Sequence, residues 1–406
     1  MKFGAISTAF FLTLQSSRAF VANNRYGTFP RAQNTISMSS SSNAVSGTST
    51  NTESSGMAPE FEGAMSQVIS TLTAAIETPS MEAPLVHFTK EYFTACNDAN
   101  EAGLDVTAEV AAKNVMNAMQ YAMQFGLNNK FTFGVTHKAL RGKDPEEEDG
   151  NTVDFYDFGC DFFRPAVDVE NSAVLGQDAL KKAMDQIKNG ENVVFFANHQ
   201  SEADPQVMSI LMEKAGFSKE AEELVYVAGH KVTTDTLAIP FSMGRNLICI
   251  HSKKHINADP DTKPMKQKQN LAAMSGMLKM KRKGGACIWV APSGGRDRRD
   301  LDTGKVPIAD FDQKTIDMFR LMGNKSKVPT HYYPVSMVTY DLCPPPDSIE
   351  AGTGEQRNVR FGPCAIKICD ELDNDGGVES RHIFTEKAFA SAQLGYEDCL
   401  KALGME

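Results

Sequence analysis

The C-terminal two thirds of the chain alternates short apolar runs with amphipathic stretches. The runs have the length of buried strands, and the stretches between them repeat apolar residues at helical spacing. Strands that are apolar on both faces and separated by helices predict an α/β domain, with a mixed central sheet and flanking helices. The predicted strands cover residues 193–197, 225–228, 247–250, 286–291, 332–338 and 365–369, and the predicted helices cover 176–189, 205–216, 262–283, 311–322 and 384–403.

The part of the chain before residue 150 has a different pattern. Met65, Val68, Ile69 and Leu72 recur at helical spacing, and strand-like alternation is almost absent from residues 60–142. An acidic turn at 145–150 then separates this part from the α/β pattern. We therefore predict a small N-terminal helical bundle over residues 57–150, followed by an α/β domain over 151–406.

The first 56 residues predict targeting segments rather than part of the fold. Lys2 precedes a mostly apolar stretch, and Ser17 and Ala19 are small residues at the positions that a signal peptidase recognises. Residues 20–52 contain no Asp or Glu and become rich in serine, which is typical of a transit peptide. A signal peptide over 1–19 followed by a transit segment over 20–56 resembles the two-part presequence of algae with secondary plastids. It predicts the plastid stroma; the alternative is a secreted protein with a serine-rich tail.

Charge and cysteine content narrow the functional classes. The chain has a net charge of −10, and removal of residues 1–52, which contain cations but no acid, makes it more negative. We therefore do not expect a nucleic-acid-binding protein. The eight cysteines are scattered rather than arranged as a disulfide framework. After Ala19 no apolar run reaches the length of a transmembrane helix, so we expect a soluble mature protein.

The strongest chemical motif follows the predicted strand at 193–197. The sequence Asn-His-Gln-Ser-Glu-Ala-Asp-Pro occupies residues 198–205, and Pro205 is favoured at the first position of a helix. His199 therefore lies in a strand-to-helix loop, at the edge where α/β sheets bind ligands. We expect Asp204 to hold one ring nitrogen of His199, which leaves the other nitrogen to act as a general base on a substrate hydroxyl.

A His-x4-Asp pair is a weak indication by itself. Asp204 has a structural alternative as a helix cap, and His230 with Asp235 repeats the spacing. We favour His199 because His230 lacks the preceding Asn and the following Pro. The chain has no Gly-x-Ser-x-Gly motif, so we expect direct transfer without a covalent enzyme intermediate.

Three glycine-containing or basic segments follow or flank other predicted strands. Residues 291–299 contain glycines that allow amides to converge on an anion, and the guanidinium groups of Arg296 and Arg298 in this segment suit phosphate oxygens. Residues 244–246 and 252–255 contribute further cations. Each segment alone has a structural alternative as a solvated loop or a plain turn, but their convergence at one sheet edge of an acidic chain predicts a phosphate site. The candidate residues are Arg245, Lys254, His255, Ser293, Gly294, Gly295, Arg296 and Arg298.

These motifs, in this order, resemble the plastid glycerol-3-phosphate acyltransferases, a soluble branch of the His-x4-Asp glycerolipid acyltransferase family. The resemblance runs from about residue 156 to 366. Besides 198–205 and 291–298, it includes Tyr-Asp-Phe-Gly at 156–159, Phe-Arg-Pro at 163–165, Phe-Ser-Met-Gly-Arg-Asn at 241–246, Ser-Lys-Lys-His at 252–255 and Tyr-Pro at 333–334.

The resemblance implies a reaction and assigns roles. A fatty acyl chain would pass from acyl carrier protein, or from acyl-CoA, to the sn-1 hydroxyl of glycerol 3-phosphate, with no metal or organic cofactor. His199 would be the base and Asp204 its partner. The substrate phosphate would be bound by Lys254, His255, Arg296 and Arg298, with Arg245 and Ser293 to Gly295 as further candidates.

The helix predicted at 262–283 carries the last candidate site. We expect Leu271, Met274 and Leu278 to face inward, and the helix ends in four cations. These cations either complement the helix dipole or form a docking patch for the acidic carrier protein. The four cations are Lys279, Lys281, Arg282 and Lys283.

Two other functions and a metal site remain as alternatives. A lysophosphatidate acyltransferase would use the same chemistry, but such enzymes are usually embedded in the membrane. A non-catalytic binder of carrier protein or phospholipid would not require His199 with Asp204. Contact with a membrane surface is compatible with either enzyme. The spacing of His251 and His255 suits a metal site on a helix, but here it follows a predicted strand. No Cys-x2-Cys pair completes four ligands with Cys249, so we do not expect a metal.

Overall fold

The computed structural model describes residues 56–75, 79–128, 130–142, 153–346, 356–375 and 380–405. The predicted signal peptide at 1–19, nearly all of the transit segment at 20–56 and the acidic turn at 145–150 lie outside these residues. Among the described residues, no helix has both the length and the apolar character needed to cross a bilayer.

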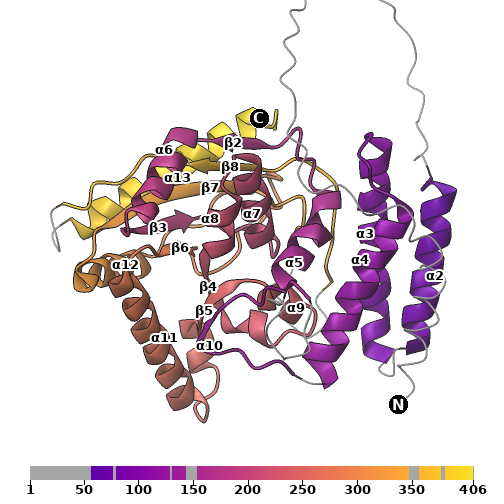
Figure 1. Cartoon of the computed structure of the whole chain (residues 1–406), viewed down its shortest axis with the longest axis horizontal. Coiled ribbons are helices and arrows are strands. Elements are labelled where there is room, and N and C mark those ends of the chain that lie inside the picture. Colours follow the sequence, from indigo (N-terminus) through magenta and orange to yellow (C-terminus); the bar gives the residue numbers. More distant parts are fainter. Residues whose placement is uncertain are drawn as a thin grey trace, which may run out of the picture. The chain divides into compact units, whose positions relative to one another are not determined.

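A sheet in the strand order β1-β5-β4-β6-β3-β7-β8-β2 forms the centre of the α/β part (Figure 1). The five strands from β5 to β7 in this order are parallel. β1 pairs antiparallel with β5, and β8 pairs antiparallel with β7, so the predicted mixed sheet is confirmed. The strands are β1 (Thr136–His137), β2 (Ala173–Leu175), β3 (Asn192–Ala197), β4 (Val225–Gly229), β5 (Asn246–Ile250), β6 (Cys287–Val290), β7 (Thr330–Val338) and β8 (Ala365–Ile368).

Helices flank the sheet because its strands alternate between two buried faces. Along β3, Val193, Phe195 and Ala197 belong to one apolar cluster, and Val194 and Phe196 belong to another. Helices α5, α6 and α7 cover the first face, whereas α11, α12 and α13 cover the second. The helices of the α/β part are α5 (Phe155–Phe163), α6 (Gln177–Lys188), α7 (Asp204–Lys214), α8 (Ser218–Glu223), α9 (Ala238–Met243), α10 (Lys253–Asn257), α11 (Lys263–Lys283), α12 (Gln313–Ser326) and α13 (Arg381–Ala402), with short 3₁₀ segments at Arg164–Ala166 and His230–Thr233.

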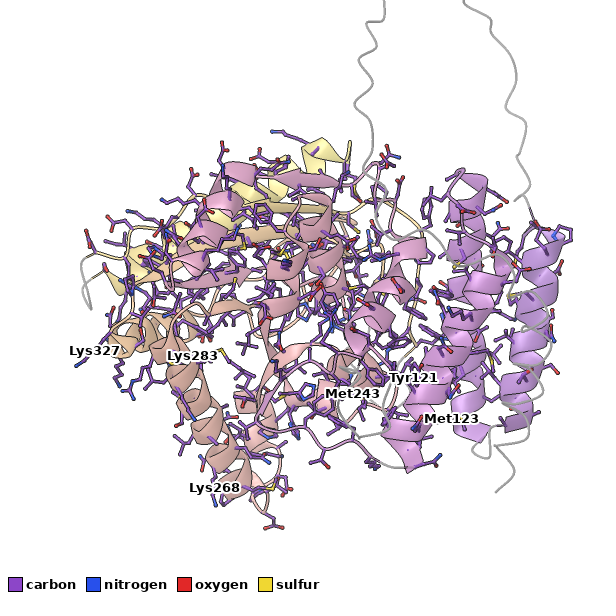
Figure 2. The ribbon with its side chains drawn as sticks, in the orientation of Figure 1. Tyr121, Met123, Met243, Lys268, Lys283 and Lys327 are labelled. Carbon is purple, nitrogen blue, oxygen red and sulfur yellow. The ribbon has the colours of Figure 1, made fainter. Side chains whose placement is uncertain are left out.

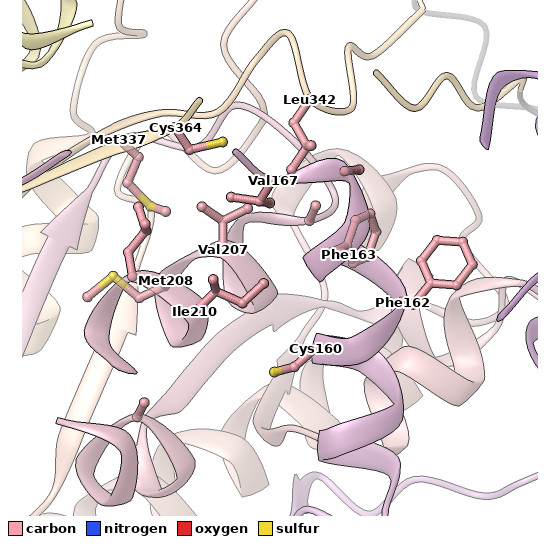
Figure 3. Packing of buried hydrophobic residues seen from close by; sticks show 14 of the residues in the cluster. Cys160, Phe162, Phe163, Val167, Val207, Met208, Ile210, Met337, Leu342 and Cys364 are labelled. Atoms are coloured by element: carbon pink, nitrogen blue, oxygen red, sulfur yellow. The ribbon is translucent and has the colours of Figure 1, made fainter. Parts of the chain in front are cut away.

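Helix α7, which begins in the His-x4-Asp motif, packs deeply against the first face of the sheet. Val207, Met208 and Ile210 lie between β7 and α5 in Figure 3, next to Met337 and Phe163. All of them are buried. This packing holds the amino end of α7 firmly against the sheet, and the motif with it.

Helices precede the α/β part, as predicted, and among the residues described from 56 onward they are α2 (Pro59–Ala75), α3 (Pro79–Glu101) and α4 (Ala108–Tyr121), the last continuing into a π-helical turn at Ala122–Asn128. The hydroxyl of Thr107 accepts a hydrogen bond from the amide of Val110 and caps α4. The region is not wholly helical, because Thr136 and His137 form β1 and pair with β5. The bundle and the sheet belong to one compact unit, Gly56–Glu406.

The predicted inward face of α11 is wrong. Leu271 is 67% exposed and Met274 is 39% exposed, whereas Ala273, Met277 and Lys281 face the sheet and are buried. The buried stripe contains a lysine, so a pattern based on apolar residues selects the neighbouring stripe instead. Lys281 is 0% exposed and cannot form part of a docking patch.

Candidate active site

The His-x4-Asp loop and the glycine-arginine loop meet at one edge of the sheet. Residues 198–203 follow β3 and residues 291–298 follow β6, and these strands are parallel neighbours. Their carboxyl ends therefore lie side by side, where open α/β sheets bind ligands. The backbone amide of Asp297 donates to the carbonyl of His199 at 2.5 Å and joins the two loops directly.

His199 and Asp204 form the predicted pair. Nδ1 of His199 lies 2.7 Å from Oδ2 of Asp204, which is 0% exposed, while the His199 side chain is 27% exposed. With Nδ1–H donated to the carboxylate, the lone pair on Nε2 can accept a proton. A fixed imidazole with one accessible edge and a buried carboxylate behind it has the geometry of a general base.

Asp204 is anchored by the loop that it closes rather than acting as a helix cap. Its carboxylate accepts from the amides of Gln200 and Ser201 at 2.8 and 3.1 Å, and from the hydroxyls of Ser201 and Thr339 at 3.0 and 2.5 Å. Burial alone would raise the pKa of Asp204, but the hydrogen bond and charge of His199, with the other donors, lower it. The acid therefore stays ionised and is ready to stabilise an imidazolium.

Buried amide side chains fasten the loop to the sheet. Asn198 donates to Asp297 at 2.9 Å and to the carbonyl of Met337 at 3.0 Å, and it accepts from the Met337 amide at 2.7 Å. Gln200 accepts from the amide of Thr339 at 2.8 Å. Sequence reasoning singled out neither residue, although both lie inside the motif. The sequence signal for both residues was the pair of side-chain amides on either side of His199.

Asp297 is a second buried carboxyl beside the pair. It accepts from Asn198 and, at 2.9 Å, from the amide of Ala309. Burial is the main cause that raises the pKa of Asp297 to about 6, and the negative charge of nearby Asp204 adds to it. The hydrogen bonds from Ala309 and Asn198 oppose the rise. Asp297 lies between two predicted phosphate-binding arginines, but its side chain points inward and holds the two loops together.

Arg296, in the glycine-arginine loop, belongs to a local network of ion pairs, and Arg298 bonds to a backbone carbonyl. Arg296 lies 3.5 Å from Glu202, which is also 2.8 Å from Arg357. Arg357 in turn lies 3.0 Å from Asp235. Arg298 donates to the carbonyl of Pro346 at 2.8 Å. The arrangement places cations next to the His199 loop, and it adds Arg357, which no sequence motif indicated.

The chain is similar to known acyltransferases. The Acyltransferase family model matches residues 178–338, which include His199, Asp204, Lys254, His255, Arg296 and Arg298. A chloroplastic glycerol-3-phosphate acyltransferase of Arabidopsis thaliana is 37% identical over 313 residues, covering 75% of this chain and 66% of that protein. The corresponding protein of Spinacia oleracea is 36% identical over 313 residues (75% and 64%), and one of Cucurbita moschata is 34% identical over 313 residues (75% and 67%).

The chain belongs to the glycerol-3-phosphate acyltransferase family. It spans about two thirds of the length of the curated relatives that it matches, with 66% and 64% for the first two. The resemblance inferred from the motifs is thereby confirmed.

The basic segment at 252–255 follows β5 and begins helix α10. Ser252 caps this helix, because its hydroxyl accepts a hydrogen bond from the amide of His255 at 3.4 Å. The ammonium of Lys266 donates to the carbonyl of His255 at 3.0 Å. The side chain of Lys254 lies outside what the structure describes. In the sheet, β4 separates β5 from β6, so α10 lies at the same edge but two strands from the arginine loop.

The glycines after β6 form a turn. Gly294 has a φ of 72°, and its amide donates to the carbonyl of Ala291 at 3.1 Å, while the hydroxyl of Ser293 donates to the carbonyl of Gly295 at 3.0 Å. A side chain at Gly294 or Gly295 would meet no atom within 4 Å. The turn is open, but the Gly294 amide is already bonded within it.

Arg245 lies in the protein interior, away from the predicted phosphate residues. It is 3% exposed, donates to Ser209 at 2.7 Å and to the sulfur of Cys160 at 3.2 Å, and stacks over the ring of Tyr156 at 4.5 Å. Arg245 precedes β5 and so lies at its amino end, opposite α10. The structure therefore gives it packing contacts within the fold, and we do not include it in the proposed substrate site.

His230 and Asp235 do not form a second dyad. His230 lies 3.2 Å from the hydroxyl of Thr233, and its ring packs 4.3 Å from that of His251. Asp235 accepts from the amides of Leu237 and Ala238, each at 3.1 Å, and pairs with Arg357. The same sequence spacing thus leads to a helix-start contact here and to a His–Asp pair at His199. In residues 56–405 as described, no cluster of three or more candidate ligands could hold a metal ion.

Proposed function

We propose that the protein transfers a fatty acyl chain from a thioester to the sn-1 hydroxyl of glycerol 3-phosphate, giving 1-acyl-glycerol 3-phosphate. The observation that carries the proposal is the 2.7 Å contact between His199 and a fully buried Asp204, next to the arginine loop, in a member of this family. The curated relatives are named glycerol-3-phosphate acyltransferases. The donor is acyl carrier protein or CoA bearing the acyl group.

The proposed chemistry is acyl transfer coupled to the uptake and return of one proton by His199. Nε2 of His199 removes the proton of the acceptor hydroxyl while the oxygen bonds to the thioester carbon. The carbon–sulfur bond then breaks, and the leaving thiolate takes the proton back from His199. Asp204 stabilises the imidazolium between these steps, as the acid does in a Ser-His-Asp site. Atoms and electrons balance without a redox partner, and the proposal includes no metal or organic cofactor.

Binding of the substrate phosphate is assigned to cations from two strands. Arg296 and Arg298 supply planar guanidinium groups that suit phosphate oxygens, and His255 with Lys254 lies at the same edge of the sheet. The acceptor hydroxyl would then lie near His199 with its phosphate toward these residues. Holding both ends of a small substrate fixes the hydroxyl against the base.

The proposed location is the plastid. Two of the relatives, from Arabidopsis thaliana and Spinacia oleracea, are named chloroplastic. The composition of residues 1–56 agrees with a signal and transit sequence, and the stroma of a secondary plastid remains our more specific proposal.

The test compares wild type with His199→Ala and His230→Ala. Each folded protein is supplied with labelled glycerol 3-phosphate and an acyl carrier protein thioester, or acyl-CoA, and labelled lysophosphatidate is measured. We expect product from wild type and His230→Ala and a loss of at least about a thousandfold for His199→Ala. Circular dichroism confirms that each variant is folded.

Other outcomes select other functions. An active His199→Ala protein would refute the proposed base. Turnover of labelled lysophosphatidate instead of glycerol 3-phosphate would indicate a lysophosphatidate acyltransferase. Binding of carrier protein or lipid without any product would favour the non-catalytic alternative.

A further inference from the structure

Helix α11 concentrates positive charge in an acidic protein. No Asp or Glu occurs between Thr262 and Arg296, although the whole chain has a net charge of −10. The nearest acids before the helix are Asp259 and Asp261. Five cations of α11 are exposed to solvent: Lys263, Lys268, Lys279, Arg282 and Lys283.

Apolar side chains share this exposed side of the helix. Leu271 is 67% exposed and lies one turn from Lys268 and from Met274, which is 39% exposed. The opposite side, Ala273 with Met277, packs into the core. The outward side of α11 is therefore both apolar and basic, and no described residue covers it.

The end of α12 extends the basic surface. A side chain at Gly284, just after α11, would lie 3.6 Å from Val328, so the carboxyl ends of the two helices adjoin. Lys325 and Lys327 are exposed at this corner. Figure 2 shows Lys283 and Lys327 near one another and Lys268 toward the other end of α11. The α11 surface, as named here, comprises Lys268, Leu271, Met274, Lys279, Arg282, Lys283, Lys325 and Lys327.

We propose that the α11 surface binds an anionic lipid membrane. Cations near a negatively charged bilayer surface are attracted to its headgroups, and an exposed leucine beside them can enter the boundary with the acyl chains. Lysine stems also lie along apolar surface while the ammonium stays in water. All the cations of this surface except Arg282 are lysines. Protein interfaces are depleted in lysine and enriched in arginine, so lipid fits this surface better than an acidic protein does.

A membrane contact would suit the proposed reaction without depending on it. The proposed product has one acyl chain and a phosphate, and such an amphiphile partitions into membranes. Binding to vesicles can be measured with no turnover, so a failure of the proposed activity and a failure of this inference are distinguishable. The inactive His199→Ala protein is expected to bind vesicles as the wild type does.

The experiment is co-sedimentation of the full chain with vesicles. One set contains phosphatidylglycerol and phosphatidylcholine in equal amounts, and the other contains phosphatidylcholine alone. Wild type is expected to sediment with the anionic vesicles and to be released by salt. The charge variant Lys279→Glu/Arg282→Glu/Lys283→Glu is expected to lose about a hundredfold or more in partitioning, since each cation near the surface contributes about fivefold.

Matched controls use exposed residues of other helices. Leu271→Ser should weaken sedimentation, whereas Leu394→Ser, in α13 at 63% exposure, should not. Lys181→Glu/Lys219→Glu/Lys387→Glu removes the same charge from α6, α8 and α13 and should retain much more binding than the charge variant. Absence of sedimentation by wild type, or equal losses in the two triple variants, would overturn the proposal. A selective loss of activity with the carrier-bound donor, without vesicle binding, would assign the surface to an acidic protein instead.

Discussion

At the scale of single residues, Glu202 places a carboxylate beside the cations proposed to bind phosphate. It contacts both Arg296 and Arg357, so its charge is compensated twice. Burial opposes the charge of Arg357, but the carboxylates of Glu202 and Asp235 outweigh it and raise the pKa, so the guanidinium remains charged at any working pH. We infer that Arg357 acts as a positioning residue that keeps Glu202 from competing with phosphate for Arg296.

Arg357→Met is therefore expected to weaken substrate binding. The Michaelis constant for glycerol 3-phosphate should rise roughly tenfold, about 1.4 kcal/mol, while kcat changes little, because the loss is of ground-state binding. Adding Glu202→Gln to this variant should restore most of the affinity. A fall in kcat at unchanged Michaelis constant, or no rescue by the second substitution, would show that Arg357 acts otherwise.

The burial of Lys281 is expected to make the free energy of unfolding depend on pH. Burial lowers the pKa of Lys281 to about 7, and its ammonium lies 3.3 Å from the carbonyl of Phe319. Below pH 10.5, the ordinary pKa of a lysine, Lys281 takes up a proton in the unfolded chain, whereas the folded protein resists that protonation until about pH 7. The free energy of unfolding is therefore reduced progressively as pH falls through this interval.

Lys281→Met removes that penalty. We expect the free energy of unfolding at pH 7 to rise by about 2–4 kcal/mol, and most of the gain to vanish by about pH 10. Urea titrations of both proteins at the two pH values measure the difference. A gain that is independent of pH would mean that the folded protein keeps Lys281 charged.

These residues also show how far sequence reasoning reaches. The contact between His199 and Asp204 follows from the strand before the motif and the Pro after it. The burial of Arg245 and Lys281 does not, because both residue types are usually exposed and no motif marks their partners. Arg357 lies far from the motifs along the chain and reaches Glu202 only through the fold.

At the scale of elements, every predicted strand and helix of the α/β part is present, with ends displaced by a few residues. Most of the elements that were missed are short: β1 and β2 have two and three residues, and α8, α9 and α10 have six, six and five. Segments of this length are too short to show a repeated hydrophobic pattern. The nine-residue α5 was also missed. The incorrect inward face of α11 has a different origin, since a lysine occupies the buried stripe.

The junction between β2 and α6 provides an element-scale prediction. Gly176 has a φ of 68°, and a side chain there would lie 1.9 Å from the carbonyl of Ile368 at the end of β8. Gly176→Ala should lower the free energy of unfolding by about 3 kcal/mol or more, because the strained backbone and the clash add together. Gly216→Ala is the control: it has a φ of 88° but no atom within 4 Å, so only about 1–2 kcal/mol should be lost. Equal losses would show that the contact with β8 is unimportant.

At the scale of the whole molecule, the helical bundle is tied to the α/β part by a buried hydrogen bond. The hydroxyl of Tyr92, in α3, donates to the carbonyl of Phe162 in α5 at 2.7 Å and accepts from Asn114 in α4 at 2.9 Å. Tyr92 is 0% exposed, and its ring stacks on that of Phe162 at 4.3 Å. Periodicity indicated a bundle, but it could not show this attachment, because the partner is a backbone carbonyl.

The attachment predicts that the bundle and the sheet unfold together. Trp289, in β6, is the chain's sole tryptophan, so its fluorescence reports on the sheet alone. Tyr92→Phe leaves the buried carbonyl of Phe162 and the half-buried amide of Asn114 without this partner and should cost about 1–3 kcal/mol, visible as a lower urea midpoint of the Trp289 signal. Tyr121→Phe serves as the control. The ring of Tyr121 contacts Phe155 and Phe158, but its hydroxyl makes no hydrogen bond within the described residues. This variant should therefore shift the midpoint much less. If Tyr92→Phe lowers the helical circular dichroism midpoint but leaves the Trp289 midpoint unchanged, the bundle is a separate folding unit, and contacts from the bundle do not stabilise the sheet that carries His199.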